Sequence, residues 1–156
     1  MPAVSTKFDT SGAFGAEVVI HGLDAVRNAL EEIGTEVRRA FDRELRQAVT
    51  TVARTAATQI DSRTGATAAG YQVKRRGSAY RIANRTRGAA ILEFAGKVNP
   101  QGTCPQGASL IRTLDEKYGR PGRVLWESWD TMQPWVIDRV RQIVDDAELT
   151  IESAGV

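Results

Sequence analysis

Residues 23–60 read LDAVRNALEEIGTEVRRAFDRELRQAVTTVARTAATQI, and the spacing of apolar residues in this stretch decides the fold. The apolar positions recur every three or four residues: Leu23, Val26, Leu30, Ile33, Val37, Phe41, Leu45, Val49, Val52, Ala56 and Ile60. Such spacing places one apolar stripe along an α-helix. An unbroken helix of this length would measure about 57 Å, whereas a compact domain of this size is only about 35 to 40 Å across. We therefore expect a break at Gly34-Thr35, with Thr35 as the new N-cap, and a neighbouring subunit to cover any overhanging part of the stripe.

The residues before this helix predict a short strand and an arm. Glu17–Ile20 reads EVVI, which is typical of a strand, and His21-Gly22 ends it. Asp24 is the candidate N-cap of the long helix. Residues 1–16 are rich in Ser, Thr, Gly and Ala and are expected to form a flexible or docking arm.

The residues after the helix predict a basic β-hairpin. The segments 71–76 and 80–84 alternate apolar and polar residues with period two, and Gly77-Ser78 between them is the expected turn. Tyr71, Val73, Tyr80 and Ile82 share one face. Residues 89–94, AAILEF, are compatible with either a third strand or a helical turn.

The last third of the chain predicts a long loop and a closing helix. Residues 96–123 are rich in Gly and Pro, and a short helix is expected from Ser109 as N-cap to Tyr118, with Gly119 after its end. A second apolar stripe then recurs at helical spacing, and Pro134 is expected to kink or restart that helix. The stripe consists of Leu125, Trp129, Met132, Val136, Val140, Ile143, Ala147 and Ile151.

Together these elements predict one α+β domain over residues 17–156. A small antiparallel sheet, made of the N-terminal strand, the basic hairpin and a candidate further strand, would pack against the long N-terminal helix and the C-terminal helix. The 156 residues are enough to bury a core without disulfides.

Charge is distributed unevenly along the chain. Residues 62–123 hold 12 Lys and Arg against 3 Asp and Glu, whereas the rest of the chain holds 9 against 16. This split indicates an acidic partner for the basic third, self-complementary packing between subunits, or simply a solvated basic face. The sequence shows no pattern of a secretory signal and no apolar run that would span a bilayer, so we expect no membrane partner and a location in the cytoplasm.

The sequence offers little that would support catalysis. His21 is the only histidine and Cys104 the only cysteine, so multi-histidine metal sites and disulfides are excluded. His21 is the one candidate general base, although a structural role is favoured for it. Cys104 is interpreted as an incidental thiol in a loop. Glu93 lies inside an apolar run and would need a buried partner; a structural ion pair with an arginine is favoured over a catalytic acid. We expect no enzyme activity, no metal and no cofactor.

Two groups of residues are candidates for an interface. The basic group lies on and around the hairpin: Lys74, Arg75, Arg76, Arg81, Arg85 and Arg87. Basic residues beside Tyr71 and Tyr80 suit single-stranded nucleic acid, but both tyrosines share the phase of Val73 and Ile82 and are expected to face the core. The second group is Trp126, Trp129 and Trp135; core packing and an interface anchor are equally compatible with these tryptophans, and Trp135 should project away from the other two.

The order of several short motifs resembles a known family. Gly22-Leu23-Asp24 precedes a long helix, Thr64-Gly65 follows it, and a basic hairpin leads to Leu92-Glu93-Phe94 with Gly96. In this order the motifs resemble the neck or head–tail joining proteins of tailed bacteriophages, the gene-ten-like family of lambdoid siphophages, which is related in pattern to minor tail and tail-completion proteins. The chain departs from the family in lacking a proline shortly before Thr64 and in carrying Ala95 between Phe94 and Gly96.

This resemblance implies a structural protein of the virion. Copies of the chain would form a ring, expected to be a hexamer, between the connector and the tail, and would contact neighbouring connector and tail proteins there. Genomic DNA would pass through the ring as cargo during ejection, and the protein would occupy the host cytoplasm during assembly. The basic hairpin would then face another protein ring or an acidic helix of a neighbour. The alternatives are a tail-terminator ring at the same junction and, from a different class, a small nucleic-acid-binding protein that uses Lys74 to Arg87.

Overall fold

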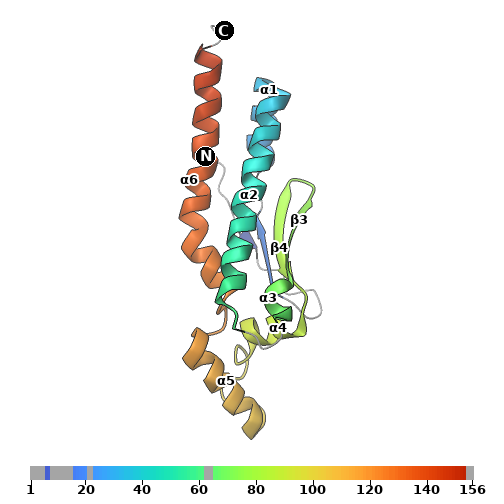
Figure 1. Ribbon diagram of the computed structural model, residues 1–156, viewed down its shortest axis with the longest axis vertical. Coiled ribbons are helices and arrows are strands. Elements are labelled where there is room, and N and C mark those ends of the chain that lie inside the picture. Colours follow the sequence, from blue (N-terminus) through green and yellow to red (C-terminus); the bar gives the residue numbers. More distant parts are fainter. Residues whose placement is uncertain (1–5, 8–15, 21–22, 62–64, 154–156) are drawn as a thin grey trace.

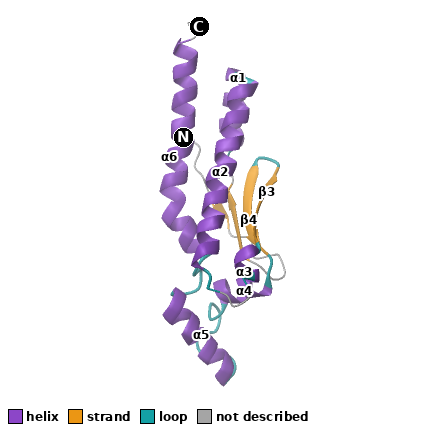
Figure 2. Ribbon diagram, viewed as in Figure 1, coloured by secondary structure: helices purple, strands orange, loops and turns teal. Residues whose placement is uncertain are grey.

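The computed structural model describes residues 6–7, 16–20, 23–61 and 65–153, and these form a mixed helix and sheet protein (Figures 1 and 2). The predicted α+β class is confirmed. The elements in chain order are β1 (Thr6–Lys7), β2 (Ala16–Ile20), α1 (Asp24–Ile33), α2 (Thr35–Gln59), α3 (Ala66–Ala69), β3 (Tyr71–Arg76), β4 (Ala79–Asn84), α4 (Arg87–Phe94), α5 (Pro105–Tyr118) and α6 (Leu125–Ser153).

The sheet is antiparallel throughout, in the order β1-β2-β4-β3. The predicted hairpin is confirmed: Arg76 pairs with Ala79 across the turn at Gly77-Ser78, and Gly77 adopts a φ of 61° that favours glycine. The N-terminal strand joins this hairpin through β4, where Val18 pairs with Ile82. In this sheet β3 is therefore an edge strand.

Residues 89–94 belong to a helix and not to a further strand. The hydroxyl of Thr86 accepts a hydrogen bond from the N–H of Ala89 at 3.2 Å and so caps the start of α4. Within the arm predicted for residues 1–16, Thr6–Lys7 forms β1 and Ala16 begins β2, while residues 1–5 and 8–15 lie outside the described part of the chain.

The long N-terminal helix breaks where the sequence predicts. Gly34 has an extended backbone with φ 163°, and it separates α1 from α2. The predicted N-caps are wrong by one residue: Leu23 and Gly34 occupy the cap positions, while Asp24 and Thr35 are the first helical residues. Neither start has a side-chain cap, although the Asp24 carboxylate still lies in the first turn, where the helix dipole favours negative charge.

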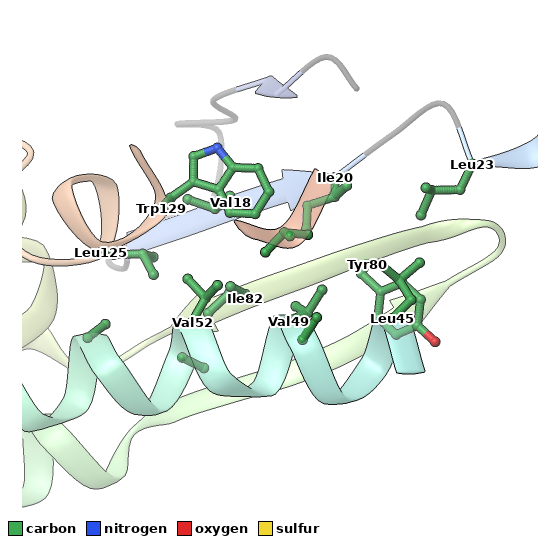
Figure 3. Close-up of a cluster of buried hydrophobic side chains, with 14 of the residues drawn as sticks. Val18, Ile20, Leu23, Leu45, Val49, Val52, Tyr80, Ile82, Leu125 and Trp129 are labelled. Atoms are coloured by element: carbon green, nitrogen blue, oxygen red, sulfur yellow. The ribbon is translucent and has the colours of Figure 1, made fainter. Parts of the chain in front are cut away.

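The core lies between the sheet and helices α2 and α6. Both helices cover the same face of the sheet, and α6 runs antiparallel to α2 beside it (Figure 1). Figure 3 shows Trp129 of α6 beside Val18 of β2, with Val52 and Val49 of α2 on the other side of the cluster. The central members are almost completely buried, namely Val18, Ile20, Phe41, Leu45, Val49, Val52, Ile82, Leu125 and Trp129.

Beyond the sheet, α1 and the second half of α6 cover each other. Leu30 of α1 and Val136 and Ala147 of α6 are buried, and the two helices are in contact. The antiparallel helix α6 therefore covers most of the overhanging stripe within one chain, although Ile33 remains 37% exposed. Cover of the remaining part by a neighbouring subunit stays a prediction. Large apolar side chains that remain exposed are scattered over several elements: Ile33, Ile91, Val98, Leu110, Trp135 and Leu149.

Helix α5 lies in the region predicted as a loop and is longer than the helix predicted there from Ser109 to Tyr118. It projects from the molecule at the end opposite to the end of α6 (Figure 1). Cys104, not Ser109, is its N-cap: the Cys104 sulfur accepts a hydrogen bond from the N–H of Gly107 at 3.3 Å, and Pro105 occupies the first turn. Gly119 ends the helix as predicted.

Helix α6 continues through Pro134 and does not restart there. None of the helices in the described segments combines the length and the apolar character needed to cross a bilayer.

Candidate protein interface

The basic hairpin presents its charges on two sides of the sheet. Lys74 and Arg76 lie on the face away from the helices and are exposed. On the same face Arg81 pairs with Glu17 of β2 at 2.8 Å, and both side chains are largely covered. Arg75 points to the opposite face and pairs with Asp42 of α2 at 3.0 Å. The six basic residues predicted as one group therefore do not lie on one continuous surface.

Lys74, Arg76, Arg85 and Arg87 are the hairpin cations that remain available. All four are exposed, and none forms an ion pair with another residue in the described part of the chain. Lys74, Arg81 and Arg85 line a shallow hollow of about 310 Å³ on the open sheet face. Lys74, Arg76, Arg85 and Arg87, unlike the paired Arg81, can attract an acidic partner without first breaking an ion pair to a described residue.

Asp42 joins three elements in an ion-pair cluster that the sequence reading missed. Its carboxylate accepts a hydrogen bond from Nε of Arg27 at 2.7 Å, while Arg75 binds its other oxygen. Arg27 is buried, and it also donates to the carbonyl of Ser78 in the hairpin turn at 2.6 Å. The cluster thereby fixes the hairpin tip to α1 and α2.

The two hairpin tyrosines face the helices, as predicted. Tyr80 is buried, and its hydroxyl donates to the carbonyl of Asp42 at 3.1 Å. Burial raises the pKa of Tyr80, and the nearby Asp42 carboxylate raises it further. Burial likewise raises the pKa of Tyr71, with a smaller contribution from Glu93. The buried ring of Tyr80 is not placed to stack on a nucleic-acid base, whereas Tyr71 is half-buried and lines a hollow beside α2.

Glu93 binds the start of α6 and not an arginine. Its Oε1 accepts hydrogen bonds from the backbone N–H groups of Val124, at 3.1 Å, and Leu125. Arg123 is buried beside it but pairs with Asp115 and donates to the carbonyl of Leu92 at 2.8 Å. The prediction of an ion pair was therefore wrong, because the positive end of a helix supplies the buried partner.

The environment of Glu93 excludes solvent. The residue is fully buried, and burial raises the pKa of its carboxyl against the opposing effects of the Leu125 and Val124 N–H groups and of Arg123. Glu93 is thus a structural residue that caps a helix from a distant position in the sequence.

The three tryptophans occupy different environments. Trp129 is buried in the core, Trp126 is half-buried, and Trp135 is exposed by 42%. Trp135 lines a hollow of about 230 Å³ between α6 and α2, beside an ion pair of Arg139 and Glu44 at 2.9 Å. Of the three, only Trp135 is exposed, and it lies away from the core that holds Trp129, as predicted. A role of Trp135 as an interface anchor stays a prediction.

The family-motif residues that the structure describes lie at joints of the fold. Leu23 is buried before α1 and Asp24 begins that helix. Gly65 precedes α3 with a φ of 68°. Gly96 has a φ of 85°, and a Cβ on it would lie 2.9 Å from Cγ2 of Ile111. Gly22, Thr64 and the candidate base His21 lie outside the described residues.

The described residues contain no cluster of His, Cys, Asp and Glu that could hold a metal ion. Cys104 is exposed at the start of α5. Comparison with models of protein families, with curated proteins and with solved structures finds no match to this chain.

Proposed function

We propose that this protein is a structural protein of a tailed-bacteriophage virion, a subunit of the head–tail connector or neck ring through which DNA passes. The observation that carries the proposal is the order of the short motifs, from Gly22-Leu23-Asp24 through Thr64-Gly65 to Glu93 and Gly96. The motif residues that the structure describes support the proposal, because they start helices, cap the start of α6 or occupy tight turns. Motifs of an assembly protein are expected to preserve shape, whereas motifs of an enzyme are expected to converge on a cavity.

The exposed charged and aromatic side chains also support a role in assembly. Within the described residues α2 and α6 lie on one face of the sheet, and the exposed Lys74 and Arg76 lie on the other face, with Arg85 just after β4. Trp135 adds an exposed aromatic side chain on α6. Aromatic and arginine side chains of this kind are enriched at protein interfaces.

The experiment is inactivation of the gene in the phage or prophage that carries it, followed by electron microscopy and proteomics of the particles. We expect filled heads and separate tails that fail to join, and the protein itself in particles from the intact phage. Normal joined virions without the protein would contradict the proposal. Tails of uncontrolled length would instead indicate the tail-terminator ring.

A nucleic-acid-binding protein is the second candidate, favoured by the exposed Lys74, Arg76, Arg85 and Arg87, which form no ion pair with the residues that the structure describes. A gel shift of the purified protein with single- and double-stranded DNA, repeated across salt concentrations, separates the two functions. A protein that contacts phosphates loses affinity steeply as salt rises. A DNA conduit, in contrast, should bind DNA weakly so that the genome can pass.

A further inference from the structure

Helix α2 separates two flanks of opposite charge. Its residues Glu44, Ala48 and Thr51 line the hollow beside α6, whereas Arg46 and Ala53 line the hollows beside β3. Figure 1 shows the same arrangement, with α6 on one side of α2 and the β3–β4 hairpin on the other. Because the two flanks lie on opposite sides of α2, they cannot touch each other within one chain. A contact between one flank and the other therefore joins two copies of the chain.

The flank beside β3 is a basic groove. Two adjoining hollows, of about 550 and 380 Å³, share Arg46 and Val73 and run between α2 and the edge strand β3. We define the basic groove by its exposed rim, Arg43, Arg46, Arg54 and Lys74, and by its apolar floor, Ala53, Ala57, Tyr71 and Val73. The rim residues form no ion pair with the described residues, and the one carboxylate in the lining, Asp42, is already bound by Arg27 and Arg75.

The flank formed by α6 is acidic. The side of α6 opposite to its buried stripe carries the exposed residues Glu127, Asp130, Asp138, Asp145 and Glu148, which we define as the acidic face. Arg141 lies among them and pairs with Asp138 at 3.4 Å. Leu149, exposed by 62%, adjoins this face near the C-terminal end.

We propose that the acidic face of α6 in one copy docks into the basic groove between α2 and β3 of the next copy. The charges are complementary, and the exposed Leu149 matches the apolar floor at Val73 and Ala57. A second β3 is a poor occupant, because Lys74, Arg75 and Arg76 on both edge strands would repel each other.

The geometry gives this contact a direction. Because the two surfaces lie on opposite flanks of α2, each copy can bind one neighbour through its groove and another through α6. Such a heterologous contact generates a ring when its rotation closes. The inference rests on the proposed ring and identifies the surfaces that would build it.

The test uses two charge-reversed variants of the full chain. In R46E/R54E the rim of the groove holds two cations and two carboxylates and loses its net positive charge. In D145K/E148K the acidic face loses its net negative charge in the same way. We expect each variant alone to associate about ten-fold or more weakly than the natural chain, because one of the two docking surfaces has lost the net charge that attracts the other. An equimolar mixture should assemble again. The unaltered groove of one variant then meets the unaltered acidic face of the other, and the reversed residues of the two variants carry opposite charges where the altered surfaces meet. Sedimentation velocity and native mass spectrometry measure the assembled fraction.

Exposed residues on α5 provide matched controls: R112E and E116K should assemble as the natural chain does. Circular dichroism checks that every variant is folded. The inference is overturned if the natural chain stays monomeric, if either variant alone assembles normally, or if the mixture of folded variants fails to assemble. It is also overturned if R46E/R54E loses binding to DNA while assembly is unchanged. Particles that contain the protein but tolerate both variants would overturn the inference and leave the proposed function standing.

Discussion

Replacing Glu93 should show how much the fold depends on one buried carboxylate. In Glu93→Ala the backbone N–H groups of Val124 and Leu125 lose their acceptor at the start of α6. Leaving a buried donor unpaired costs about 1 to 3 kcal/mol. The gain from removing a buried carboxylate, which burial already disfavours, offsets part of this loss. We expect the free energy of unfolding to fall by about 2 to 4 kcal/mol.

A conservative variant separates the hydrogen bonds from the charge. Glu93→Gln keeps an oxygen that can accept from both N–H groups, so it should cost about 1 kcal/mol, less than half of the alanine value. Urea denaturation followed by circular dichroism measures both, and Glu116→Ala on the exposed side of α5 is the control, with an expected change within about 0.5 kcal/mol. Equal losses for the Gln and Ala variants, or a loss below about 1 kcal/mol for Ala, would refute the capping role.

Three further predictions follow from the same contacts. Asp42→Ala leaves the buried Arg27 without its carboxylate and should cost about 3 kcal/mol in urea denaturation, whereas Glu36→Ala, in an exposed pair, should change little. Gly96→Ala should lower the melting temperature more than Gly119→Ala: both backbones have positive φ, but only a Cβ at position 96 meets another side chain. Burial raises the pKa of the Glu93 carboxyl, so its contribution to stability is fully present below the unfolded-state pKa and is lost as pH rises through the folded-state pKa. The free energy of unfolding of the natural chain should therefore fall relative to that of Glu93→Gln as pH rises. A difference between the two that does not change with pH would contradict this.

The sequence predicts the elements well where a local pattern determines them. The break at Gly34 follows from the cost of glycine in a helix, and the hairpin follows from period-two alternation around Gly77-Ser78. The sequence predicts the start of α5 too late, because Ser109 is also a favourable N-cap residue. Pro105, which suits the first turn of a helix, is the signal that could have located it.

Contacts between distant residues could not be predicted in the same way. Arg27 and Asp42 lie on different helices, and Glu93 caps a helix that begins 32 residues later. No periodicity encodes such pairs, because they depend on how the helices pack in space. The same reason explains the overhanging stripe: its spacing shows that it must be covered, but not that α6 of the same chain covers most of it.

The central claim is that this chain works as one subunit of an assembly of its own copies. The most direct test is the mass of the purified protein in solution, measured by native mass spectrometry and sedimentation over a range of protein and salt concentrations. We predict a closed oligomer that dissociates as salt rises, since exposed ionic contacts are screened within about 8 to 10 Å at physiological ionic strength. A folded monomer at every concentration and every salt level would contradict the claim.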